Sequence, residues 1–126
     1  MIWAIDFDGT LCVDEYPAIG APRPDVLDFA KRVRRAGDSL ILWTCRIGDE
    51  LTAAVKWCRD NGLEFDAVND NLPECIDRYG NNCRKVYADY YIDDRALEIG
   101  MVGYYSSLVY GDYAEPPAEI AKEAAT

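Results

Sequence analysis

Short apolar runs alternate along the chain with stretches in which apolar residues recur at helical spacing. The runs are typical of buried strands, which we expect at residues 2–5, 40–43, 64–68 and 90–92. The amphipathic stretches predict helices at residues 24–37, 51–61 and 74–79. This alternation predicts an α/β fold, a three-layer α/β/α parallel sheet, in a single domain over residues 1–126.

Two segments lie outside this alternation. Residues 11–23, with Gly20 and Pro22, predict a short flap or hairpin beside the tip of the first strand, too short to be a cap domain. Residues 103–105 are interpreted as an added edge strand, and Pro116 with Pro117 as the start of a short terminal helix.

Polar side chains follow three of the predicted strands where each strand ends. Asp6 and Asp8 end the first, Thr44 ends the second, and Asp93 with Asp94 ends the last. Because the carboxyl ends of parallel strands meet at one edge of a sheet, we expect all five side chains to face one crevice.

The spacing of Asp6 and Asp8 carries the chemical signal. Alternation along an extended segment places both carboxylates on one side, where they repel unless a cation or a shared proton joins them. Mg²⁺ prefers oxygen ligands and leaves positions for water and a substrate phosphate. The pattern therefore indicates phosphoryl transfer, and the alternative interpretation is a strand end with a solvated Asp-Gly turn.

Charge and missing residue types narrow the chemistry. A formal net charge of −10 and a pI near 4.3 argue against a general nucleic-acid-binding surface. There is no histidine, so carboxylates must carry the acid-base work. The five cysteines form no C-x-x-C pair, and no apolar stretch has the length of a membrane span or the form of a signal peptide. We therefore expect a reduced, cytoplasmic protein without a membrane partner.

In this order the motifs resemble those of the haloacid dehalogenase-like superfamily of aspartate-nucleophile phosphohydrolases. The first motif, D-x-D-G-T after a strand, is matched at residues 6–10, and the second, a strand ending in Thr or Ser, at Thr44. Lys85 fits the basic residue of the third, and Asp93 with Asp94 fits the paired acids of the fourth. The resemblance covers roughly residues 2–97 and implies the small, cap-less type of this Rossmann-like fold.

The resemblance implies roles for the acids. Asp6 is the expected nucleophile and a metal ligand. Asp8 is the expected general acid-base, with its main-chain carbonyl on the metal. Asp93 and Asp94 are expected to hold Mg²⁺ directly or through water.

Other residues are expected to contact the substrate. By the same resemblance, Thr44 would hydrogen-bond the phosphoryl oxygens, and Lys85 would neutralise their charge and pair with Asp6. The further predicted substrate contacts are Gly9, Thr10, Cys45 and Arg46. Cys45 receives no catalytic role because no histidine can activate it.

Three basic residues have alternative interpretations. Lys56 lies within a predicted helix, where a solvated lysine is favoured over a phosphate contact. Arg46 either grips a substrate phosphate or carboxylate, or caps a carbonyl or pairs with Asp49 or Glu50. For Arg95 the same two interpretations stand, a substrate contact or a structural role.

The leading hypothesis is a Mg²⁺-dependent phosphatase that hydrolyses phosphomonoesters of a small substrate through an aspartyl phosphate. One alternative is a polynucleotide-end phosphatase, because residues 92–95 resemble the final motif of such domains, although the acidic charge counts against nucleic acid. Another is a non-catalytic phosphate- or metal-binding module, against which the retention of Asp8 counts.

Residues 101–113 are rich in aromatic residues and carry one charge, Asp112. Because aromatic residues and methionine are enriched at interface cores, one interpretation is a homo-oligomer contact that brings one subunit over another's site. The other is an edge strand packed inside its own domain.

Overall fold

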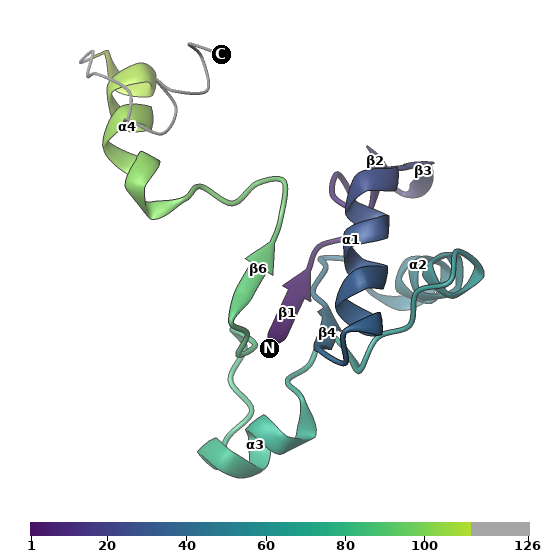
Figure 1. Cartoon of the computed structure of the whole chain (residues 1–126). Coiled ribbons are helices and arrows are strands. Elements are labelled where there is room, and N and C mark those ends of the chain that lie inside the picture. Colours follow the sequence, from purple (N-terminus) through teal and green to yellow (C-terminus); the bar gives the residue numbers. More distant parts are fainter. Residues whose placement is uncertain (112–126) are drawn as a thin grey trace. The chain divides into compact units, whose positions relative to one another are not determined.

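Residues 1–111 are described by a computed structural model, and residues 1–94 of it contain a four-stranded sheet in the order β5-β4-β1-β6 (Figure 1). Its strands are β1 (Ile2–Ile5), β4 (Ser39–Leu42), β5 (Ala67–Val68) and β6 (Tyr90–Ile92). β1 pairs in parallel with β4 on one side and with β6 on the other, and β4 pairs in parallel with β5. The predicted α/β fold with a parallel sheet is confirmed, although β5 is shorter than the strand expected at residues 64–68.

Three helices cover the two faces of the sheet, α1 (Pro24–Arg35), α2 (Gly48–Asp60) and α3 (Pro73–Tyr79). Successive side chains of a strand point to opposite faces. Ile5 accordingly packs in one buried cluster with Leu27 of α1 and Ala54 of α2. Its neighbour Ala4 packs in a second cluster with Cys75 of α3. The sheet therefore lies between α1 and α2 on one side and α3 on the other.

Between β1 and α1 the chain forms an antiparallel hairpin of β2 (Cys12–Glu15) and β3 (Ala18–Pro22). The hairpin is tied to the tip of β1, because the N–H of Gly9 donates to the carbonyl of Cys12 at 2.8 Å. The side chains of Leu11 and Cys12 are fully buried and anchor its base in the core. The predicted flap is thus confirmed as a hairpin.

The chain divides after Asp94 into two compact units. The second contains a short 3₁₀ helix, η1 (Ile99–Met101), and α4 (Val102–Tyr110). The edge strand expected at residues 103–105 is wrong, because these residues lie within α4, which continues directly from η1. The carboxylate of Glu98 accepts the N–H of Gly100 at 3.0 Å, and Gly111 ends α4 in the left-handed conformation.

The helices and strands described above do not test two predictions, the terminal helix and the single domain. Pro116 and Pro117 lie outside the described residues, and the single domain over residues 1–126 stays a prediction. No helix within residues 1–111 is long and apolar enough to cross a membrane.

Candidate active site

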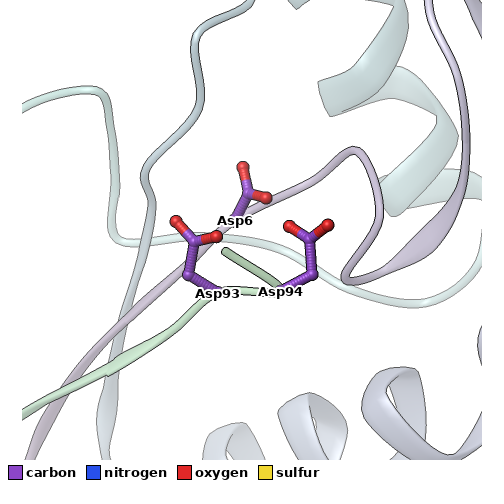
Figure 2. A group of neighbouring side chains, drawn as sticks. All are labelled: Asp6, Asp93 and Asp94. Atoms are coloured by element: carbon purple, nitrogen blue, oxygen red, sulfur yellow. The ribbon is translucent and has the colours of Figure 1, made fainter. Parts of the chain in front are cut away.

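Three carboxylates converge at the carboxyl edge of the sheet. The N–H of Asp6 donates to the carbonyl of Ile92 at 2.9 Å, so the pairing of β1 with β6 continues up to the paired acids. Asp6, Asp93 and Asp94 each offer an oxygen within 4.8 Å of the others. Figure 2 shows the three side chains gathered around the two strand ends. Three of the four predicted metal ligands therefore come together.

Thr10 links the two strand ends through its hydroxyl group. Its hydroxyl lies 3.3 Å from Oδ2 of Asp6 and 3.4 Å from Oδ1 of Asp94, and it accepts the N–H of Asp94 at 3.0 Å. Thr10 is only 4% exposed. In this arrangement its side chain orients two acids, and its predicted contact with substrate remains a prediction.

Gly9 permits the close approach of Asp94. Its φ is +84°, in the left-handed region, and a Cβ added to it would lie 2.3 Å from Oδ2 of Asp94. Its N–H is used in the bond to Cys12. The residue therefore serves the geometry of the acidic cluster, whereas its predicted contact with substrate is untested.

The crowding of the acids perturbs Asp6. Burial at the strand end, reinforced by the charge of Asp93, raises the pKa of Asp6 to about 6. The neighbouring N–H of Phe7 and the hydroxyl of Thr10 act in the opposite direction and do not offset it. A cation in this cluster would relieve the repulsion.

This shift predicts how the metal-free protein responds to pH. The pKa of Asp6 is about 6 in the folded state, above its ordinary value of 3.8, so the free energy of unfolding falls as pH rises between these values. Raising the pH from 4.5 to 7 should cost on the order of 1 kcal/mol from this group, because Asp6 is only partly buried and water screens it. We expect the melting temperature in EDTA to fall by a few degrees over that range. In Asp6→Asn the part of this fall in melting temperature that comes from Asp6 should vanish. A fall as large as that of the wild type would contradict the raised pKa of Asp6.

Asp8 does not join the cluster, because Arg46 holds its carboxylate. Nε donates to Oδ2 and Nη2 donates to Oδ1, both at 2.8 Å. This pair raises the pKa of Arg46 above its ordinary value. Arg46 also caps main-chain carbonyls, including that of Glu50 at 3.2 Å. Of the interpretations of Arg46, carbonyl capping is confirmed, but the ion pair is with Asp8 instead of the side chain of Asp49 or Glu50.

Thr44 lies at the neighbouring strand tip, since the N–H of Trp43 donates to the carbonyl of Ile5 at 2.9 Å. The N–H of Thr44 donates to Oδ1 of Asn69 at 2.8 Å, and its hydroxyl accepts the N–H of Arg46 at 3.2 Å. Within residues 1–111 no acceptor takes the hydroxyl proton of Thr44. That proton is therefore available to a phosphate oxygen.

The other predicted contacts are less well placed. Lys85 is exposed, with Nζ 5.3 Å from the centre of the Tyr91 ring, and it lines a cavity of about 630 Å³ on the α3 face of the sheet. In the described part of the chain it forms no ion pair with Asp6, so its pairing with the nucleophile stays a prediction. Cys45 is exposed. Lys56 pairs with the exposed Asp60 at 2.7 Å, as expected of a solvated helix lysine.

Sequence reasoning missed the residue that holds the second strand tip. Asn69 follows β5 with a φ of 51°, accepts the N–H of Thr44, and donates to the carbonyl of Arg46 at 3.3 Å. It lies between the strand predicted at residues 64–68 and the helix predicted at residues 74–79, in a segment to which no site residue was assigned. An asparagine directly after a strand is a signal that could have placed it at the same edge, because Asn tolerates the left-handed conformation and bonds nearby backbone.

Comparison with known proteins gives one informative match. No family model and no curated protein matches the sequence. A solved structure of a conserved protein from Bacteroides thetaiotaomicron is 36% identical and superposes with a TM-score of 0.69, over 90% of this chain and 93% of that one.

Proposed function

The chain belongs to the same family as the conserved protein of Bacteroides thetaiotaomicron, and for this member we propose a Mg²⁺-dependent phosphatase that forms an aspartyl phosphate on Asp6. Its substrate is a small phosphomonoester. We further propose that the domain is of the cap-less haloacid dehalogenase-like type. The segment between β1 and α1 supports this assignment, because it contains only the β2–β3 hairpin.

The convergence of Asp6, Asp93 and Asp94 within 4.8 Å is the observation that carries the proposal. Three carboxylate oxygens suit Mg²⁺, a hard cation with oxygen ligands at about 2.0–2.1 Å that keeps positions for water and phosphate. The side chain of Asp8 faces Arg46 instead, so only its main-chain carbonyl is proposed as a ligand. When bound, Mg²⁺ would neutralise charge on the phosphoryl oxygens.

Two half-reactions can be written on the side chains of this site. In the first, a carboxylate oxygen of Asp6 attacks phosphorus, the bond to the leaving oxygen breaks, and that oxygen takes a proton from Asp8. In the second, water attacks phosphorus and gives its proton to Asp8, while the bond to Asp6 breaks and releases phosphate. The hydroxyl of Thr44 donates to a phosphoryl oxygen throughout.

The test is a panel of phosphoesters assayed with Mg²⁺ and with EDTA. It includes an aryl phosphate, sugar and nucleotide monophosphates, and an oligonucleotide 3′-phosphate. We expect phosphate release that requires the metal and favours a small substrate. Release confined to the oligonucleotide would favour a polynucleotide-end phosphatase. Absence of metal-dependent release across the whole panel would refute the proposal.

Gly9→Ala should weaken Mg²⁺ binding, because the new Cβ displaces the carboxylate of Asp94. We expect a loss of affinity on the order of 10- to 100-fold, measured by calorimetric titration. Gly37→Ala is the matched control, since Gly37 has the same φ of +84° but nothing within 4 Å of an added Cβ. It should lose stability through backbone strain and keep its affinity. Equal affinities in the two variants would contradict the role of Gly9.

Asp8→Asn should impair the first half-reaction most with poor leaving groups. An alkoxide needs the proton that Asp8 supplies, whereas a nitrophenolate leaves with less help. In single-turnover phosphorylation we expect a loss of about 10²-fold or more with a sugar phosphate and a clearly smaller one with an aryl phosphate. Equal losses on the two substrates would show that Asp8 is not the general acid.

A further inference from the structure

Arg46 is the largest fully buried side chain in the described part of the protein, with 1% exposure. A buried guanidinium needs partners for all of its donors. Nε and one N–H of Nη2 hold the two oxygens of Asp8, each at 2.8 Å. The remaining three N–H groups donate to the carbonyls of Pro17 at 3.2 Å, Ala18 at 2.8 Å and Glu50 at 3.2 Å. Every donor of Arg46 is thus used within the protein.

Two aromatic rings complete the surroundings of the guanidinium. Its central carbon lies 5.0 Å from the centre of the Phe7 ring and 5.1 Å from that of Tyr16, within the range of cation–π attraction. Tyr16 and Pro17 form the turn of the β2–β3 hairpin, and Phe7 lies between the two acids of the first motif. One side chain therefore connects the hairpin turn, the first turn of α2 and the carboxylate of Asp8.

From these contacts we infer that Arg46 is a positioning residue, which fixes the carboxylate of Asp8 at the leaving-group side of the site and couples that carboxylate to the β2–β3 hairpin. This inference rests on the proposed phosphatase function. A planar guanidinium that binds both oxygens fixes the plane of the carboxylate as well as its place. It occupies two of about four lone-pair sites on Asp8, which leaves a site for the proton exchanged with the leaving group.

The same contacts disfavour a direct role of Arg46 in binding substrate. To reach a phosphate, the guanidinium would have to give up bonds to Asp8 or to the carbonyls of the hairpin and α2, since all of its donors are already used. It would also lose its contacts with the rings of Phe7 and Tyr16. Because the carboxylate of Asp8 is held in place, the substrate must bind with its leaving oxygen next to that carboxylate.

The first test compares Arg46→Lys and Arg46→Gln with Asp8→Asn in single-turnover phosphorylation, over phosphoesters with good and poor leaving groups. Lysine keeps the charge but cannot hold both oxygens in one plane. We expect both Arg46 variants to share the pattern of Asp8→Asn, a kcat loss of at least 10-fold that grows with a poorer leaving group, at little change in KM. In the double variant Arg46→Lys/Asp8→Asn the loss should not exceed that of Asp8→Asn. A raised KM, with equal losses on all leaving groups and additive losses in the double variant, would overturn the inference in favour of a substrate contact.

The second test does not depend on activity or on the folding of Arg46 variants. Asp8→Asn has nearly the same shape as the wild type but cannot pair its charge with Arg46. Hydrogen exchange of amides in residues 12–22 should become at least several-fold faster in this variant, while amides of α1 keep their wild-type rates. Unchanged exchange in the hairpin would refute the coupling. Absence of metal-dependent hydrolysis by the wild type would refute the phosphatase function and the role in catalysis, and the exchange result would still decide whether Asp8 and the hairpin are linked.

Discussion

Asp6→Asn is expected to abolish formation of the phosphoenzyme and to reduce metal-dependent phosphate release by about 10⁴-fold or more. An amide oxygen is a poor nucleophile, and it also carries no charge for Mg²⁺. The variant should remain folded, because Asp6 is only partly buried and the burial that raises its pKa disfavours its charge. Acid-quenched single turnovers with ³²P-labelled substrate measure the covalent intermediate directly.

Asp28→Asn provides the matched control for this loss. Asp28 is an exposed carboxylate on α1, so its replacement changes the net charge by the same amount without touching the acidic cluster. We expect wild-type rates from it. If Asp6→Asn still yields a labelled, acid-stable protein with Mg²⁺, then the nucleophile lies elsewhere and the role of Asp6 is wrong.

The convergence at the strand tips could be predicted from the sequence because it follows from topology alone. β1, β4 and β6 are short apolar runs that end in polar residues, and parallel strands bring their carboxyl ends to one edge. The sequence could therefore place three acids together without any information on side-chain packing: Asp6, Asp93 and Asp94. The hairpin after β1 could also be predicted, because its strands and its turn lie within one short segment of the sequence.

The partner of Asp8 could not be predicted in the same way. Asp8 and Arg46 are 38 residues apart, and their pairing depends on where the hairpin and the first turn of α2 place three carbonyls. The sequence shows only that Arg46 follows a strand, which is compatible with a substrate contact or a capping role. α4 was missed because aromatic residues favour strands by propensity. In the structure Glu98 caps η1, which leads directly into α4, and Gly111 ends α4 in the left-handed conformation.

The ion pair of the buried Arg46 with the partly buried Asp8 predicts the largest effect on stability. Removing one partner of such a pair leaves the other charge without compensation, and in this case three carbonyls also lose their donor. We expect Arg46→Met to lower the free energy of unfolding by about 3–5 kcal/mol, measured by urea denaturation at pH 7. Arg32→Met, at an exposed position in the last turn of α1, should change it by less than about 1 kcal/mol.

The double variant Asp8→Asn/Arg46→Met separates the cost of the unpaired charge from the cost of the lost packing and capping. Asparagine carries no charge, so the double variant should recover a part of the stability lost by Arg46→Met, on the order of 1–2 kcal/mol. The remaining deficit measures the orphaned carbonyls and the two emptied ring contacts. If the double variant is less stable than Arg46→Met by the full cost of Asp8→Asn alone, the two side chains do not interact energetically, and the pairing seen at 2.8 Å contributes nothing to the fold.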